Sequence, residues 1–159
     1  MISLRSPKPT DAAAIWKLLE ALPELERNTC YAYVVLCADF ADSCVVAEDD
    51  AQNIVGFVIG YVPPRRPDEV FVWQVGVARS ARGAGLGARM LDHVARSTSA
   101  RFLTATVSPD NEASRRLFRS FARRREASCA ISAGYPAELF AAPHQPEELM
   151  RIGPLTLKE

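Results

Sequence analysis

Glycine is concentrated at one point of this chain, because three of the eight glycines, Gly83, Gly85 and Gly87, lie within five residues. An apolar stretch over residues 70–77 comes before them, and apolar residues at helical spacing follow from Leu86 to Val94. Glycine adopts backbone conformations that other residues avoid, so this cluster marks a tight turn. The sequence therefore predicts a unit of strand, turn and helix.

The turn has the chemistry of a phosphate-binding loop. Backbone amides at the start of a helix have no helical partner and, with the helix dipole, favour an anion. Without Cβ atoms the main chain can approach a diphosphate closely, and Arg82 adds a positive charge at the mouth of the turn. A glycine-rich turn without a ligand is the alternative.

Residue identity excludes two familiar phosphate loops. A Walker loop ends in Gly-Lys followed by Ser or Thr, whereas Gly87 is followed by Ala88 and Arg89. A dinucleotide-binding fingerprint needs a third glycine where Met90 stands, and it normally lies near the start of the chain. The sequence therefore points to another class of phosphate-bearing ligand.

Length and composition favour one globular domain over residues 1–159, with 48% hydrophobic and 24% charged residues. The formal net charge is zero, so no overall field would attract nucleic acid or an anionic membrane. No apolar run approaches the roughly 20 residues that cross a bilayer, and residues 1–5 lack the layout of a signal peptide. We expect a cytoplasmic protein that binds neither nucleic acid nor a membrane.

The four cysteines predict neither a metal centre nor a disulfide framework. Cys30, Cys37, Cys44 and Cys129 form no Cys-x-x-Cys pair and have no histidine at metal-ligand spacing. We interpret them as small apolar residues and expect no metal. Cys30 and Cys37 could share a helix face, and a catalytic thiol there is the alternative.

Apolar periodicity and turn residues give the order of elements, and the class is α/β (α+β). In the N-terminal half we expect a strand, a helix capped by Thr10 or Asp11, a short helix, a hairpin and a further, largely buried strand, at residues 2–5, 11–22, 31–36, 44–47 with 54–62, and 70–77. In the C-terminal half we expect a helix directly after the glycine turn. It is followed by a strand at residues 102–107, a helix at 112–123, a strand at 129–132, a short helix at 136–140 and a closing strand at 149–155. Periodicity alone leaves residues 31–36 open to a strand.

Two motifs carry a resemblance to a known family. Residues 82–87 (Arg-Gly-Ala-Gly-Leu-Gly) look like the Gln/Arg-x-x-Gly-x-Gly/Ala diphosphate loop of GNAT acetyltransferases, and the preceding strand holds the bulge-prone Gly76. Residues 111–118 (Asn-Glu-Ala-Ser-Arg-Arg-Leu-Phe) are similar to that family's Asn-x-x-Ala-x-x-Leu-Tyr helix. The resemblance implies a mixed, mostly antiparallel sheet flanked by helices and splayed between its fourth and fifth strands, which end near Val77 and begin near Phe102.

The resemblance also implies acetyl-CoA as co-substrate, gripped by the splayed strands, the glycine turn and the second motif. The residues that it assigns to acetyl-CoA are Val75, Gly76, Val77, Arg82, Gly83, Ala84, Gly85, Leu86, Gly87, Asn111, Ser114 and Phe118. One of them departs from the pattern, since the family tyrosine that often protonates the leaving thiolate is Phe118 here. Water, another side chain or no acid at all would then do that work, because a thiolate of pKa about 8.5 is a tolerable leaving group.

Further stretches resemble the branch of the family that acetylates N4 of L-2,4-diaminobutyrate in ectoine synthesis, and a homodimer is implied with it. These stretches are residues 28–33, 36–48, 71–75, 144–147 and 151–154. A diamino acid offers two ammonium groups and a carboxylate, so its pocket needs acidic groups, donors and an aromatic wall. By resemblance, the substrate-binding residues are Glu26, Thr29, Tyr31 and Trp73, and the catalytic residues are His144 and Glu147.

Each of these residues has a plainer interpretation. Trp73 and Tyr31 could be core aromatics, His144 a surface histidine, and Glu26 and Glu147 solvated carboxylates. In the functional reading, Glu147 takes the proton of the amine, directly or through water or His144. Backbone amides of residues 75–77 then hold the thioester and stabilise the oxyanion.

Two other functions remain open on sequence alone. A GNAT enzyme could acetylate a protein lysine, a polyamine or an aminoglycoside, although the zero net charge and the lack of an acidic run disfavour a polycationic partner. Alternatively, the chain could be a non-catalytic CoA-binding module, for which the missing hydroxyl at Phe118 is the only support.

Overall fold

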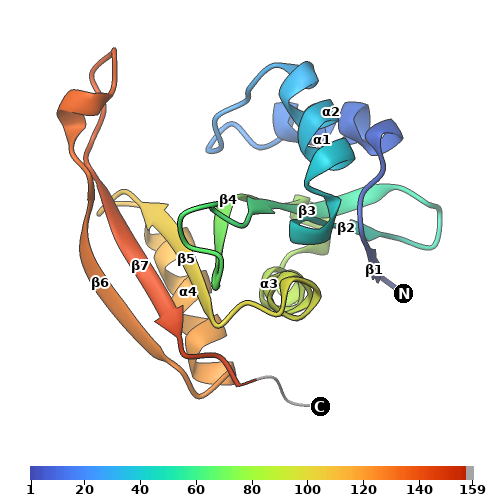
Figure 1. Cartoon of the computed structure of the whole chain (residues 1–159). Coiled ribbons are helices and arrows are strands. Elements are labelled where there is room, and N and C mark those ends of the chain that lie inside the picture. The colour runs from blue at the N-terminus through green and yellow to red at the C-terminus, as the bar shows by residue number, and fades with distance from the viewer. Residues whose placement is uncertain (157–159) are drawn as a thin grey trace.

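The computed structural model describes residues 1–156, which form one seven-stranded sheet flanked by helices on both faces (Figure 1). The strands are β1 (Ser3–Arg5), β2 (Val45–Glu48), β3 (Ile54–Tyr61), β4 (Glu69–Val77), β5 (Phe102–Val107), β6 (Ser128–Tyr135) and β7 (Glu147–Gly153). The helices are α1 (Ala12–Glu20), α2 (Cys30–Asp39), α3 (Leu86–Thr98) and α4 (Glu112–Arg124). In this described part, no helix combines the length and apolarity needed to cross a membrane.

The strand order is β1-β2-β3-β4-β5-β7-β6, and every neighbouring pair is antiparallel except the parallel pair β4 and β5. That pair is matched only from Glu69 opposite Phe102 to Val72 opposite Ala105. Beyond Val72 the two strands diverge, while β4 stays paired with β3 as far as Val77. The splay between the fourth and fifth strands, and with it the expected mixed sheet, is confirmed.

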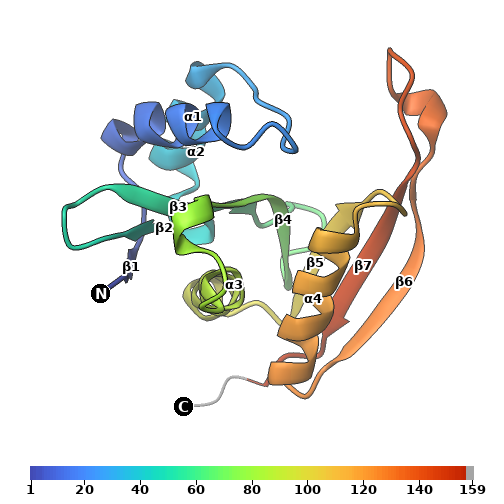
Figure 2. The same cartoon turned by 180° about the vertical axis from the view of Figure 1, so that it is seen from behind.

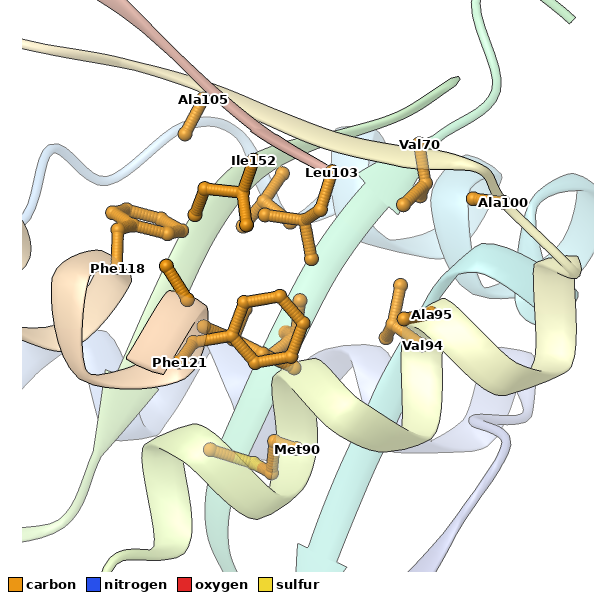
Figure 3. Packing of buried hydrophobic residues seen from close by; sticks show 14 of the residues in the cluster. Val70, Met90, Val94, Ala95, Ala100, Leu103, Ala105, Phe118, Phe121 and Ile152 are labelled. Carbon is orange, nitrogen blue, oxygen red and sulfur yellow. The ribbon is translucent and has the colours of Figure 1, made fainter. Parts of the chain in front are cut away.

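Alternation along the central strands feeds two apolar cores. Val45, Ala47 and Val58 point to the face covered by α3 and α4, whereas Val46 and Phe57 point to the face covered by α1 and α2 (Figure 2). Figure 3 shows side chains of α3, α4, β4, β5 and β7 meeting in the larger core, with Phe118 and Phe121 entering from α4. Together the cores fix β4 and β5, the strands that flank the splay.

A bulge in β4 lies at Trp73 and not at Gly76, so the expectation for Gly76 was wrong. Ile59 pairs with Gln74 and Gly60 with Val72, which leaves Trp73 as the extra residue. Gly76 pairs regularly with Phe57, and a Cβ there would lie 2.4 Å from Cε1 of that ring. Glycine is therefore required at position 76 because any side chain there would collide with the Phe57 ring.

Most predicted elements are confirmed, including the helical state of residues 31–36 within α2. The first helix is not capped by a side chain as expected, because the carboxylate of Asp11 instead accepts from the Lys8 amide and from Arg5. The largest difference is at the C-terminal end. There β6 is longer than the predicted strand and β7 begins two residues earlier than predicted, and the two strands form a hairpin whose tip projects to the same side of the sheet as α1 and α2 (Figure 1).

Candidate active site

A cleft of about 530 Å³ opens where β4 and β5 diverge. The segments around it are the α1–α2 loop, the bulged part of β4, the end of β5, the start of α4 and the β6–β7 hairpin. Its lining is formed by Glu24, Leu25, Glu26, Asn28, Tyr61, Phe71, Val72, Trp73, Gln74, Val75, Ala105, Thr106, Val107, Ser108, Asn111, Ser114, Phe118, Tyr135, Phe140, His144 and Glu147. The cleft is large enough for a small amine and the end of a coenzyme arm.

The structure brings eight of the eighteen predicted site residues together on this cleft, and residues 76–77 and 82–87 of the coenzyme set lie outside its lining. Four of them come from the predicted substrate and catalytic set and four from the predicted coenzyme set, namely Glu26, Trp73, His144 and Glu147, with Val75, Asn111, Ser114 and Phe118. Two residues predicted to bind substrate lie outside this lining. Tyr31 is 75% exposed, and the Thr29 hydroxyl caps α2 by accepting from the Ala32 amide at 3.4 Å.

Glu147 has the environment of a general base. It begins β7, and in the described chain its Oε2 is buried with no hydrogen-bond partner. Burial raises the pKa of this carboxyl above its ordinary value, the positive charge of a protonated His144 lowers it, and the Glu26 and Asp110 carboxylates raise it further. A carboxylate that is desolvated and unpaired is available to accept a proton.

His144 stands beside this carboxylate and is held by its own contacts. Its ring stacks on Phe140 with centroids 3.8 Å apart, and its Nδ1 lies within hydrogen-bond distance of the Gln145 carbonyl. If Nδ1 donates to that carbonyl, Nε2 is left as an acceptor. Such a histidine could relay a proton or hold a charged substrate.

The substrate-side wall is the α1–α2 loop, residues 21–29, which carries Glu26. Trp16 Nε1 donates to the Asn28 carbonyl at 3.1 Å, and Gln74 Nε2 donates to the Glu26 carbonyl at 2.5 Å. The loop is also tied to the glycine turn, since Arg82 Nη2 lies 2.8 Å from Oε1 of Glu24. Contacts with Trp16, Gln74 and Arg82 thus hold this loop in place along the cleft.

Trp73 forms the aromatic part of the wall and is not a core residue. As the extra residue of the bulge it is 40% exposed, and its ring stacks on Tyr33 with centroids 6.4 Å apart. A bulge re-aims a side chain out of the regular alternation. The indole can therefore face a ligand in the cleft.

The glycine turn has the backbone geometry expected of an anion cradle. Gly83 and Gly85 have φ of 89° and 69°, a region that strains other residues, and Gly85 is the N-cap of α3. The turn is exposed, and the Arg89 amide is the first to bond back to Gly85. The preceding α3 amides can face a diphosphate. Gly87 has a packing role, because a Cβ there would lie 2.9 Å from Leu117.

The second motif shapes the coenzyme side of the cleft. Asn111 caps α4 by accepting from the Ser114 amide at 3.2 Å, and Phe118 is 4% exposed in the larger core. Hydroxyl groups that sequence reasoning missed lie elsewhere on the lining, on Tyr61, Thr106, Ser108 and Tyr135. Their local sequence carries no motif, so only the cleft reveals them.

No metal centre is evident in the part of the chain that the structure describes, where no group of three or more His, Cys, Asp or Glu side chains could hold an ion. The cysteines differ in exposure. Cys37 and Cys44 are buried, and desolvation raises the pKa of these thiols to about 12 and about 11. Neither is suited to act as a thiolate nucleophile.

Comparison with known proteins gives consistent matches. Residues 12–122 match the acetyltransferase (GNAT) family. The L-2,4-diaminobutyric acid acetyltransferase of Bordetella parapertussis is 45% identical over 157 residues, covering 96% of this chain and 84% of that protein. The enzyme of that name from Streptomyces coelicolor is 41% identical over 160 residues, covering 98% and 94%.

A solved structure also covers the whole fold. It is the diaminobutyrate acetyltransferase EctA from Paenibacillus lautus in complex with its substrate L-2,4-diaminobutyric acid and coenzyme A. The match has a TM-score of 0.90 at 36% identity and covers 100% of this chain and 98% of that one.

Proposed function

The chain belongs to the GNAT family of acetyltransferases, and on this premise we propose that it transfers the acetyl group of acetyl-CoA to N4 of L-2,4-diaminobutyrate. The product is N4-acetyl-L-2,4-diaminobutyrate, as in ectoine synthesis. Relatives that share the whole length of the chain carry this activity in their names, and one is similar in structure with both ligands bound.

One structural observation carries the choice of substrate, namely that of the three glutamates on the cleft only Glu24 is paired with an arginine in the described part of the chain, which leaves the carboxylates of Glu26 and Glu147 to face a ligand. Glu26 and Glu147 come from opposite walls, and the charge of Glu26 acts on the pKa of Glu147. A diamino acid brings two ammonium groups, so each carboxylate has a cation to meet. Trp73 supplies an apolar surface for the short carbon chain between them.

Glu147 acts as the base in this proposal. An ammonium of pKa about 10 has no lone pair, so the amine must lose a proton before it attacks the thioester. Glu147 accepts that proton, directly or through water or His144. Its desolvated carboxylate suits a base that must pull a proton from a cation bound beside it.

The divergent end of β4 supplies the oxyanion stabilisation. Among the described residues, no β4 residue from Trp73 to Val77 pairs with β5. Backbone amides of residues 75–77 on that side can hold the thioester carbonyl and stabilise the negative oxygen of the tetrahedral intermediate. The bond to sulfur then breaks, and thiolate leaves without a proton from Phe118.

The glycine turn and α4 hold the coenzyme in this proposal. The N-terminal amides of α3 and Arg82 meet the diphosphate, while Asn111, Ser114 and Phe118 flank the arm. Thr29 and Tyr31 stay assigned to the amine by resemblance. The proposal also includes a cytoplasmic location and a homodimer, for which the edge strand β6, with exposed Ile131 and Tyr135, offers an apolar surface.

Turnover by the purified protein tests the proposal directly. With acetyl-CoA and L-2,4-diaminobutyrate we expect stoichiometric release of free thiol and an acetyl group on N4, as seen by NMR of the product. Because Cys30 and Cys129 are partly exposed, the thiol signal needs a blank without amine. Faster turnover of a polyamine or peptide lysine would favour another acceptor, and no thiol release with any amine would favour a CoA-binding module.

The pH profile should report the base. Glu147 must be ionised to accept a proton, and burial raises its pKa, so kcat/KM for diaminobutyrate should fall on the acid side with a midpoint above about 4.3, the value of a free Glu. Glu147→Gln should lose this limb in a profile measured from about pH 4 to 9. An unchanged limb in that variant would assign it to another group, such as the amine of the substrate.

A further inference from the structure

Gln74 is a buried amide on the wall of the cleft, and the bulge in β4 accounts for its orientation. Val70 and Val72 pack in the core under α3 and α4, and so do Val75 and Val77. The alternation of side chains between the two faces of β4 is therefore interrupted at Trp73, the extra residue. Gln74 is placed on the opposite face, toward α1 and α2, where it is 8% exposed.

Both ends of this amide are used. The Tyr33 hydroxyl donates to Oε1 of Gln74 at 2.8 Å, and Nε2 of Gln74 donates to the Glu26 carbonyl at 2.5 Å. The Tyr33 hydroxyl in turn accepts from the Asn28 amide at 3.4 Å. The three hydrogen bonds form a chain that starts at one amide of the loop, passes through the Tyr33 hydroxyl and the Gln74 amide, and returns to a carbonyl of the same loop, with every group donating to the next.

The anchor at Tyr33 is rigid. Its ring is fully buried in the core under α1 and α2, and it stacks on Trp73. The loop is also held at Glu24 by Arg82, at Leu25 by packing on the same core, at Arg27 by Glu20, and at Asn28. Gln74 grips the loop between them, at the peptide of Glu26 itself.

We propose that Gln74 is a positioning residue, which holds the carboxylate of Glu26 over the amine-binding end of the cleft. This inference rests on the proposed function, in which Glu26 meets an ammonium group of the substrate. A free loop must lose conformational entropy when it binds a ligand, and a loop fixed in advance avoids that cost. Losing the clamp should therefore weaken amine binding and leave the coenzyme side unchanged.

Gln74→Met tests this inference, because methionine has similar length and volume but forms neither hydrogen bond. We expect the KM for diaminobutyrate to rise about tenfold, because the loop loses the hydrogen bond that holds the Glu26 carbonyl. The KM for acetyl-CoA and kcat should stay within about twofold of wild type. Gln74→Asn, which keeps an amide too short to bridge both partners, should shift the same constants in the same direction if the first variant folds poorly.

Thr104→Val is the matched control. Thr104 is a buried polar residue on the neighbouring β5, and its hydroxyl lies 3.5 Å from the Val70 carbonyl, away from the loop. We expect this variant to change thermal stability but not the KM for diaminobutyrate. If both Gln74 variants lose stability and all kinetic constants shift together as in a general loosening, Gln74 is only structural and the inference fails.

A double-mutant cycle with Glu26→Gln separates the roles further. If Gln74 acts through the Glu26 carboxylate, Gln74→Met should raise the KM for diaminobutyrate no further in a Glu26→Gln background. Additive effects, or an unchanged KM in Gln74→Met alone, would overturn the inference. Wild-type protein that does not acetylate diaminobutyrate would instead refute the proposed function, before any variant is compared.

Discussion

Replacing Glu147 with glutamine is expected to lower kcat for diaminobutyrate about 100- to 1,000-fold at neutral pH, the usual loss when a general base is removed. The amide keeps the shape of the side chain but cannot accept the proton of the ammonium. Steady-state turnover at saturating acetyl-CoA measures the loss. The KM for acetyl-CoA should change little, because in the proposed function Glu147 meets the amine and not the coenzyme.

The neighbouring Glu148→Gln is the matched control for this variant. Glu148 is the next carboxylate on β7, but it pairs with Arg115 at 3.0 Å and does not line the cleft.

Burial raises the pKa of Glu147 in the folded protein, so its ionised form opposes folding as pH rises through that pKa. Glu147→Gln should therefore not be less stable than wild type at pH 7. If Glu147→Gln kept a kcat within a few-fold of wild type, another group or water would take the proton.

Replacing Gly85 with valine is expected to weaken acetyl-CoA binding about 10- to 100-fold while the protein stays folded. Gly85 has φ of 69°, which a β-branched residue adopts only at a cost of about 1–3 kcal/mol. Space is not the problem, because the nearest atom to a new Cβ is Nη1 of Arg124 at 3.9 Å. The turn should relax away from the geometry that presents its amides. Isothermal titration with coenzyme A measures the affinity.

Gln52→Val provides the control for strain alone. Gln52 is an exposed residue in the β2–β3 hairpin with φ of 64°, so valine suffers a similar backbone penalty there, far from the glycine turn in the chain. Because glutamine already carries part of this penalty, Gln52→Val should lower the melting temperature somewhat less than Gly85→Val, and it should leave the affinity for coenzyme A unchanged. An unchanged affinity in Gly85→Val would place the diphosphate elsewhere.

The limits of sequence reasoning are clearest at the β6–β7 hairpin. Residues 129–132 were predicted as a strand and residues 149–155 as the closing strand, whereas the pairing runs from Ser128 opposite Gly153 to Tyr135 opposite Glu147. Most of β6 is exposed, so it lacks the apolar alternation that marks a half-buried strand. Its length is set by pairing with β7, which is distant in sequence, and the same pairing carries Glu147 to the cleft.

The amino-acid sequence by itself determined the strand, turn and helix around Gly83 and Gly85, the helix that starts near Glu112 and the family, because these are encoded by residues close together in the chain. Only the tertiary structure decided that β4 bulges at Trp73, that Gln74 meets Tyr33 and Glu26, and that one carboxylate oxygen of Glu147, Oε2, is buried without a hydrogen-bond partner among the described residues. These features depend on register and on contacts between distant segments. Local sequence carries no signal for register or for these contacts. Local propensity permits many strand pairings, and only the packing of the whole chain selects one of them.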